Sequence, residues 1–268
     1  MIINHPLLTA ALCTLPLLAL NGCSDADTRS KSITQHLSAE SPPDTPQWGL
    51  DQLPNGHVLI SMQVLKTPEA LRAAGRDIEL IPQEGIWVDE LQELDPETSQ
   101  VVWSWSAWDH IVQERDADAP NYSPSITDHP GKLDLNYGSA HHRDWLGITS
   151  VAYNPERDEI AISAGRMGEV WIIDHSLSTE QARGPAGDLL YRWGNPDAYG
   201  LGTADDRQLQ WPARVQWQGD QLIITRTDAH HTILRPLVDG DRGYVRTLDE
   251  PWGPHVDLGK DWLAMSAR

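Results

Sequence analysis

The chain has 268 residues, a net charge of -19 at pH 7, twelve tryptophans and no phenylalanine. Its acidic residues are spread along the sequence, and such a surface repels polyanions, so we expect no nucleic-acid partner. Both cysteines, Cys13 and Cys23, lie near the start, which excludes zinc ribbons, thiol catalysis and a disulfide framework in the rest of the chain.

The first residues predict a secretory leader. An apolar run from Leu7 to Leu20 is too short to span a bilayer as a permanent helix. It is followed by Asn21-Gly22-Cys23, the layout of a lipoprotein cleavage box, so we expect residues 1–22 to be a signal peptide and Cys23 to be lipidated. That places the protein on the periplasmic side of the cell envelope, with the lipid as its membrane contact. An ordinary signal peptide or an uncleaved anchor are the alternatives, because no Lys or Arg precedes the run.

Residues 23–45 predict a disordered tether. They are rich in Ser, Thr, Lys and acidic residues and show no apolar period, so they bury too little apolar surface to fold. Residues 46–268 are enough for one sizeable core, and we expect them to form a single domain.

From residue 46 onward, short apolar alternations lie between Gly, Pro, Asn and Asp, which is typical of strands. A single segment, Thr67–Gly75, has a helical pattern. When the strands are aligned on their turns, a repeated hairpin becomes visible, and each copy opens with a tryptophan. The copies begin at Trp48, Trp145, Trp211 and Trp252.

A hairpin of this kind cannot bury its apolar face alone, so repeated hairpins indicate radially packed sheets. Two further strands, Gly85–Leu91 and Gln100–Trp105, follow the first copy and complete a four-stranded sheet. We therefore predict an all-β fold, a β-propeller of four-stranded blades, with a β-sandwich as the alternative. The fourth copy reaches Arg268 without an outer pair, so either an N-terminal segment completes the ring or the chain is a shortened relative of a longer protein.

A series of segments in chain order resembles the bacterial arylsulfotransferases over roughly residues 46–235. These segments are Trp103–Gln113, Asn121-Tyr122, His129–Gly131, Leu133–Tyr137, Asp144-Trp145, Tyr153–Pro155, Glu169–Ser176 and Leu189–Tyr199. The resemblance implies a periplasmic propeller that moves a sulfuryl group from a phenolic sulfate ester to a phenol acceptor, without a nucleotide sulfate donor or another cofactor. It also implies a central histidine that carries the group, since imidazole is both a nucleophile and a good leaving group.

Two positions of the family pattern lack that imidazole. Where the family reads Asp-Trp-x-His-x-Asn, this chain has Asp144–Thr149, so the histidine falls on Gly147. Where the family reads Gln-His-Asp, this chain has Pro212-Ala213-Arg214, so the nucleophile falls on Ala213. The catalytic residues are therefore unassigned. Two hypotheses remain: an arylsulfotransferase-type enzyme, or a non-catalytic propeller lipoprotein that binds a small aromatic or anionic ligand or a protein partner.

Arg166 falls within one residue of the family's sulfate-contacting arginine, and a guanidinium fork suits a sulfate group. The candidate substrate-binding residues are Arg166, Arg214, His255, Trp48, Trp145 and Trp211. The tryptophans fit an aromatic-lined channel or plain core packing, and Arg166 also fits a surface ion pair. Adjacent histidines, as in His141-His142 and His230-His231, point to opposite faces of a strand, so we predict no metal site.

Overall fold

The computed structural model describes residues 50–138, 143–236 and, for the backbone, 255–259. All of them belong to one unit of the chain, residues 42–268. The predicted signal peptide, the lipidation site Cys23, the tether of residues 23–45 and Trp48 lie outside the described residues and stay predictions.

Three four-stranded antiparallel sheets form this unit, and in each sheet every strand pairs with the next one along the chain. Sheet one contains β1 (Leu50–Gln52), β2 (Val58–Lys66), β3 (Ile86–Asp95) and β4 (Gln100–Ser106). Sheet two contains β7 (Ile148–Asn154), β8 (Glu159–Ala164), β9 (Glu169–Asp174) and β10 (Tyr191–Trp193). Sheet three contains β11 (Pro212–Gln218), β12 (Gln221–Arg226), β13 (His231–Leu234) and β14 (His255–Gly259). A short parallel pair, β5 (Ile111–Val112) and β6 (Leu133–Asp134), connects the first two sheets along the chain.

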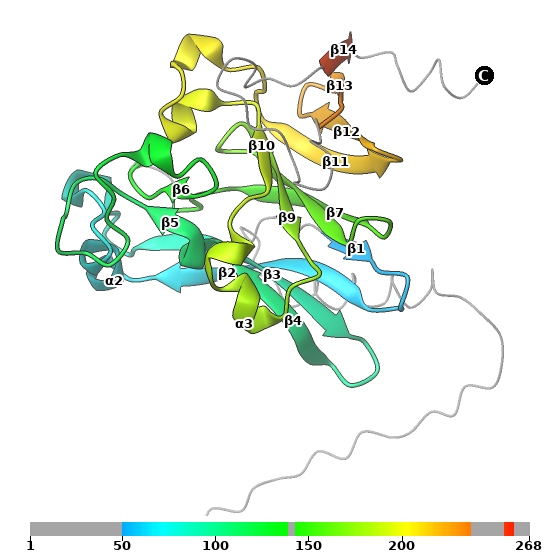
Figure 1. The fold of residues 1–268 in the computed structure, drawn as a ribbon, viewed down its shortest axis with the longest axis horizontal. Helices are drawn as coiled ribbons and strands as arrows, with labels where there is room; N and C mark the ends of the chain where they lie inside the picture. The colour runs from blue at the N-terminus through cyan, green and yellow to red at the C-terminus, as the bar shows by residue number, and fades with distance from the viewer. Residues whose placement is uncertain (1–49, 139–142, 237–254, 260–268) are drawn as a thin grey trace, which may run out of the picture. The chain divides into compact units, whose positions relative to one another are not determined.

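Sheet two is buried on both faces. Every residue of β8 and every residue of β9 except Asp174 is at least nine-tenths buried. Alternate side chains of β9 belong to two different cores. Trp171 and Ile173 join the core shared with sheet one, whereas Val170 and Ile172 join the core shared with sheet three. The period of two along a strand therefore produces a layered stack in which both faces of sheet two are covered (Figure 1).

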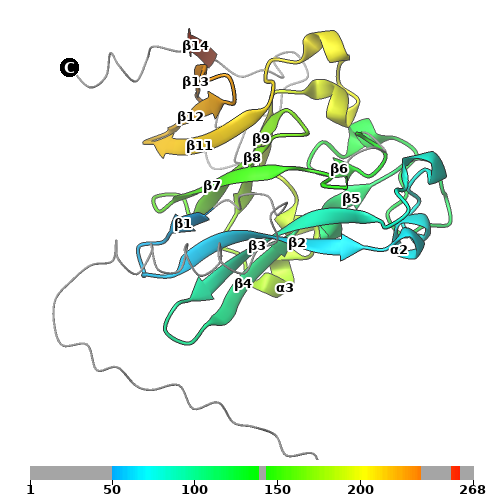
Figure 2. The ribbon, with the colours of Figure 1, turned by 180° about the vertical axis from the view of Figure 1, so that it is seen from behind.

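The first strands of the three sheets lie together. The backbone N–H of Tyr153 in β7 donates to the Asp51 carboxylate in β1 over 2.7 Å. On the other side of β7, Ser150 Oγ accepts from the backbone N–H of Val215 in β11 over 3.2 Å. Figure 2 shows β7 between β1 and β11 from behind. This arrangement is that of the inner strands of consecutive propeller blades, and the prediction of an all-β fold of four-stranded blades is confirmed.

The predicted fourth hairpin is wrong in its first strand. Strand β14 pairs with β13 as the outer strand of sheet three, so it completes an existing blade and does not open a new one. The sequence did not show that β14 is an outer strand, because outer and inner strands have the same local alternation of apolar and polar residues. The opening residue of that copy, Trp252, and its second strand lie outside the described residues.

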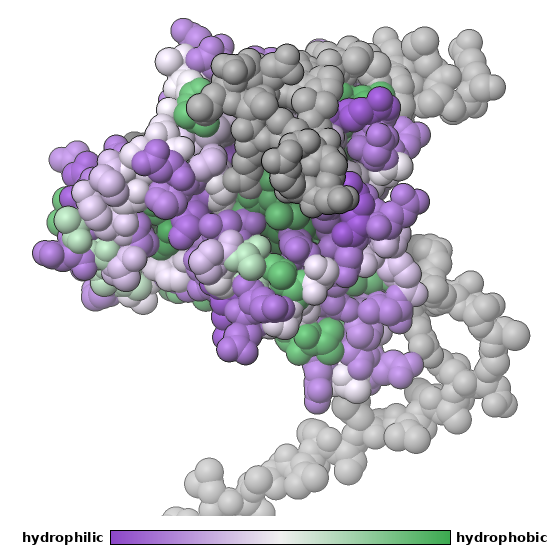
Figure 3. Space-filling model, viewed as in Figure 1, coloured by the Kyte–Doolittle hydropathy of each residue, from purple (hydrophilic) through white to green (hydrophobic). Residues whose placement is uncertain are grey.

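Helices are few and short. The predicted helical segment is present as α2 (Pro68–Ala73), which begins with Thr67 as a cap whose hydroxyl accepts from Ala70 N–H. A second helix, α3 (Thr179–Ala182), was not predicted, although Ser178 and Gln181 form a capping box before it. No helix among the described residues has the length and apolar character needed to cross a bilayer. On the face seen in Figure 3, hydrophilic residues predominate and apolar ones form separate small patches.

Candidate functional site

The candidate site lies where β7 and β11 begin. Three segments meet there: residues 144–147 before β7, the turn at residues 165–168 between β8 and β9, and Trp211 before β11. Two backbone hydrogen bonds hold the turn against the first segment, from Gly165 N–H to Gly147 O at 2.9 Å and from Arg166 N–H to Leu146 O at 3.1 Å. These bonds fix the position from which the Arg166 side chain extends.

Arg166 is anchored along one edge of its guanidinium. Its Nε donates to Asp144 Oδ2 over 3.2 Å, and the other oxygen of Asp144 accepts from Gln63 Nε2 at 2.9 Å and from Gly147 N–H at 3.0 Å. No hydrogen bond within the described residues engages the two terminal nitrogens of Arg166. The side chain is 26% exposed. The sequence-based alternative of an ion pair is therefore correct for Nε, and the other edge of the guanidinium remains available to an anion.

Trp211 presents its indole beside this arginine. The Arg166 guanidinium lies 5.8 Å from the centroid of the indole ring, and the residue is 51% exposed. Its backbone adopts a positive φ of 46°, which is uncommon for a large side chain. The carbonyl accepts a hydrogen bond from Thr227 N–H at 3.1 Å. A strained, hydrogen-bonded backbone that holds an indole in solvent is a feature found at binding sites.

Gly147 has no space for a side chain. Its φ is +63°, and a Cβ at this position would lie 2.8 Å from Arg166 Cγ and 3.3 Å from Arg166 N. The first distance is shorter than real Cβ contacts, so Arg166 and any side chain at position 147 compete for the same space. The position at which the sequence resemblance predicts a histidine is thus crowded by Arg166.

Ala213 and Thr149 lie on irregularities of the two inner strands. The pairing register shifts between Pro212 and Arg214 in β11 and between Ile148 and Ser150 in β7, which leaves Ala213 and Thr149 without a partner in the ladder. Bulges of this kind redirect side chains and are frequent next to active sites.

Two hydroxyl groups hold these bulges together. Thr149 Oγ1 donates to the carbonyl of Pro212 over 3.2 Å, and Ser163 Oγ donates to the same carbonyl over 2.8 Å. These hydrogen bonds join the beginnings of β7 and β11 at the residue that follows Trp211. The backbone that carries the site is therefore held in place before a ligand binds.

A buried carboxyl group lies behind Asp144. Asp89 is 1% exposed, and Ser61 Oγ lies 3.5 Å from its Oδ1. Within the described residues, Oδ2 of Asp89 has no hydrogen-bond partner. Burial, and secondarily the negative charge of Asp144, raises the pKa of Asp89 well above its ordinary value. Asp89 therefore keeps its proton to a higher pH than an exposed aspartate does.

The other predicted binding residues are placed differently. Trp145 is buried, and its Nε1 donates to Tyr137 O at 3.1 Å, which favours the core-packing interpretation. Arg214 is exposed on β11. Burial raises the pKa of the half-buried Asp51, and the charge of Arg214 is a smaller opposing effect. His255 lies in β14, of which the structure describes the backbone.

Sequence reasoning missed Gln63 and Asp89. They are register partners across β2 and β3, and nothing in the sequence indicates that these two strands face Asp144. Asp89 did leave one signal, a carboxylate inside the apolar strand pattern of residues 86–91, because a buried charge without a role is rare.

No group of three potential metal ligands is found among the residues that the structure describes. His231 is buried there and its Nδ1 lies 3.1 Å from Thr225 Oγ1. His141 and His142 lie outside the described residues.

Comparisons with solved structures return matches of low similarity, among them a β-propeller domain. The β-propeller domain of Cps50 (Swd1) from Myceliophteria thermophila is 9% identical, with a TM-score of 0.35, over 85% of this chain and 44% of that one. Hydrazine synthase from Kuenenia stuttgartiensis is 11% identical, with a TM-score of 0.33, over 80% and 39%. The chain spans less than half the length of either structure.

No curated protein matches the chain. A family model does: that of the arylsulfotransferases (ASST) matches residues 48–181, half of the chain. This stretch contains sheet one, most of sheet two, and Asp144, Gly147 and Arg166 of the candidate site. By this match, the chain belongs to the arylsulfotransferase family.

Proposed function

We propose that the protein recognises aryl sulfate esters at the beginning of β7 and β11, with Arg166 on the sulfate group and Trp211 on the aromatic ring. One observation carries this proposal: a guanidinium anchored through Nε, with no hydrogen bond to its terminal nitrogens in the described residues, lies 5.8 Å from an exposed indole. A guanidinium edge matches two sulfate oxygens, and an indole face offers the phenyl ring a stacking surface.

Sulfuryl transfer to a phenol acceptor is the activity that the family suggests. A histidine route needs an imidazole where the sulfur is attacked, and neither Gly147 nor Ala213 has a lone pair to offer. The crowding of Gly147 by Arg166 supports a site in which the arginine has replaced the histidine. We therefore expect binding of aryl sulfates without a sulfohistidine at these two positions.

Binding is tested by titrating the full chain with 4-nitrophenyl sulfate, and with 4-nitrophenol and inorganic sulfate as its two halves. We expect the ester to bind at least tenfold more tightly than either half, and Arg166→Gln and Trp211→Ala each to weaken it about tenfold, as loss of one charged hydrogen bond or one stacked ring does. Arg72→Gln is the control, because that arginine is exposed on α2. Unchanged binding in both site variants contradicts the proposal.

Transfer is tested in the same preparation by adding a phenol acceptor and following release of 4-nitrophenol, with mass spectrometry of the protein for a sulfated side chain. Absence of both signals, together with ester binding, fits a non-catalytic member. A sulfated histidine with turnover overturns the expectation for transfer and identifies a nucleophile elsewhere in the chain.

We also propose that the protein is exported and anchored by lipid at Cys23. The apolar run and the Asn21-Gly22-Cys23 site support this location. Expression in a bacterium fed with a labelled fatty acid tests it. Wild-type protein should carry the label in the membrane fraction, and Cys23→Ser should carry none. Label on the serine variant, or none on the wild type, refutes the anchor.

A further inference from the structure

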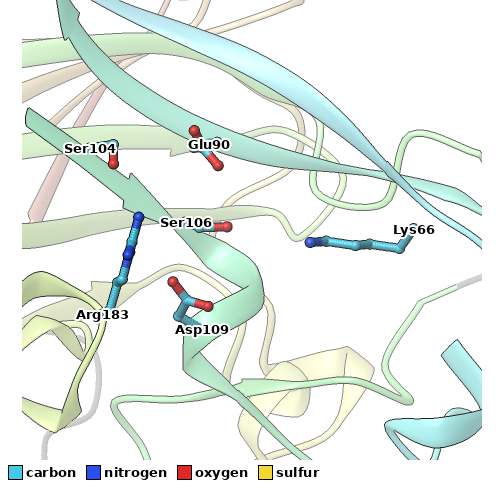
Figure 4. A pocket seen from close by; sticks show the side chains of 6 residues that line it. All are labelled: Lys66, Glu90, Ser104, Ser106, Asp109 and Arg183. Carbon is cyan, nitrogen blue, oxygen red and sulfur yellow. The ribbon is translucent and has the colours of Figure 1, made fainter. Parts of the chain in front are cut away.

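A polar pocket away from Arg166 lies beside the outer strands of sheet one. Its volume is about 320 Å³, and it is lined by Lys66, Glu90, Ser104, Ser106, Asp109 and Arg183. Lys66 ends β2, Glu90 belongs to β3, the two serines to β4, and Arg183 directly follows α3. Figure 4 shows the side chains of Lys66, Glu90, Asp109 and Arg183 directed toward one space, with Ser106 between them. We call this the Lys66 pocket.

The walls of the Lys66 pocket are fixed by the core. The segment that carries α3 is attached to β4 by two hydrogen bonds, from Trp103 Nε1 to Leu177 O at 2.9 Å and from Ser104 N–H to Thr179 Oγ1 at 3.1 Å. Trp105, on the same strand, donates through Nε1 to Gly187 O at 2.8 Å. Arg183 is therefore held opposite β4 by neighbours on both sides, and the pocket is preformed.

Its charges are of both signs and are kept apart. None of the ion pairs among the described residues joins Lys66 or Arg183 to Glu90 or Asp109, although all four line the same space. The Lys66 ammonium lies instead 4.9 Å from the ring centroid of Trp108, and Glu90 accepts from the neutral amide of Gln92 over 2.8 Å. Opposite charges separated by a cavity are complementary to a ligand that carries both.

We infer that the Lys66 pocket binds a small zwitterion with an ammonium and a carboxylate, the size of an amino acid. Lys66 and Arg183 take the carboxylate, Glu90 and Asp109 take the ammonium, and the serine hydroxyls fill the remaining hydrogen bonds. A simple anion would meet two carboxylates, and a simple amine would meet two cations, so neither is matched as well. The volume lies at the lower end of the range for small-molecule pockets, about 300–1,000 Å³.

Calorimetric titration of the full chain with L-serine tests this inference. Ethanolamine, which lacks the carboxylate, and 3-hydroxypropanoate, which lacks the ammonium, are the one-charge analogues, and sulfate is the simple anion. We expect L-serine to bind at least tenfold more tightly than all three. Lys66→Met and Glu90→Gln should each weaken it about tenfold, as removal of one charged partner does.

Arg72→Gln and Glu97→Gln are the matched controls, since both residues are exposed and outside the pocket. Circular dichroism melting of every variant separates loss of binding from loss of fold, and a folded Lys66→Met protein is required for the comparison. Equal binding of L-serine and either one-charge analogue overturns the inference, as does tighter binding of sulfate or unaltered serine binding in both pocket variants. Arg166→Gln should leave serine binding unchanged, which separates this pocket from the proposed aryl sulfate site.

Discussion

Gly147 shows how one residue decides what the site contains. Its left-handed backbone and the approach of Arg166 both disfavour a side chain. We expect Gly147→His, which introduces the residue that the sequence resemblance predicts here, to lower the free energy of unfolding by about 1–3 kcal/mol, the usual range for a strained backbone position. It should also weaken aryl sulfate binding by displacing Arg166. Urea denaturation and ester titration measure the two effects.

Gly219 is the matched control for this substitution. It also has a positive φ, +60°, but a Cβ there would meet nothing within 4 Å. Gly219→His therefore incurs the backbone cost without the crowding, and it should be the milder change. Equal losses of stability in the two variants would mean that Arg166 does not compete for the space at position 147.

Asp89 makes the stability of the protein depend on pH. Because burial raises its pKa well above the ordinary value, the folded state holds the proton more tightly than the unfolded chain. Stability is therefore lost as pH rises from the ordinary carboxyl pKa, near 4, toward the folded value, by about 1.4 kcal/mol per pH unit in the ideal case. Asp89→Asn removes this loss, so the variant should match the wild type at pH 4 and exceed it at pH 7.

Urea denaturation at several pH values measures that gap. Asp95→Asn is the opposite control, because hydrogen bonds from Thr98 lower the pKa of Asp95, and its substitution should reduce stability at pH 7. A less stable Asp89→Asn protein at pH 7 would show that the ionised carboxylate is stabilised by a partner.

The contacts of these residues could not be predicted from the sequence, although some of the residues could. Positions 147, 166 and 213 were chosen from the sequence resemblance, which depends only on the order of residues along the chain. The resemblance did not reveal that Arg166 fills the space of position 147, because that contact joins a turn between β8 and β9 to the segment before β7. The part played by Gln63 depends on the packing of sheet one against sheet two, which no local pattern encodes.

At the scale of elements, the alternation of apolar and polar residues identified the strands well, but it did not predict the bulges. A bulge changes the pairing of two strands by one residue without disturbing the pattern of either strand. The two bulges leave Thr149 and Ala213 outside the ladders, and Thr149 Oγ1 donates to Pro212 O in β11, so the shape of the site arises from irregular pairing. The partner of β14 was missed for the related reason that pairing between strands is a tertiary property.

One polar cluster ties sheet one to sheet two. Glu93 in β3 accepts from His57 Nδ1 at 2.5 Å and lies 3.0 Å from Nε2 of His175, the residue after β9. Burial raises the pKa of Glu93, but hydrogen bonds from His57, Asn55 and His175 outweigh it, and the pKa is lowered. This interaction therefore contributes stability above the ordinary carboxyl pKa and loses it as pH falls through the folded value.

Glu93→Gln should lower the free energy of unfolding at pH 7 by about 1–3 kcal/mol, because the two imidazoles lose a charged acceptor. The difference from the wild type should shrink in acid. Urea denaturation at pH 7 and pH 4 in 0.3 M salt measures both values, with Glu97→Gln on the exposed β3–β4 turn as the control. A loss that is the same at both pH values would show that packing, and not the charge of Glu93, links the two sheets here.

For the whole molecule, charge is the dominant long-range property. The net charge is -19, so the acidic side chains repel one another in the compact state. The surface in Figure 3 is mostly hydrophilic, so salt can screen this repulsion. The screening length falls from about 30 Å at 0.01 M to about 8 Å at 0.15 M ionic strength. We expect the melting temperature to rise with sodium chloride over this range.

Glu97→Lys tests the origin of that rise. The substitution changes the net charge by two at an exposed turn, so at 0.01 M salt it should raise the melting temperature by relieving repulsion. At 0.3 M salt the gain should nearly vanish, because the charges no longer sense one another across the molecule. Glu97→Gln should give about half the effect. A gain that persists at high salt would assign it to the turn itself, and the acidity of the chain would then have no measurable effect on its stability.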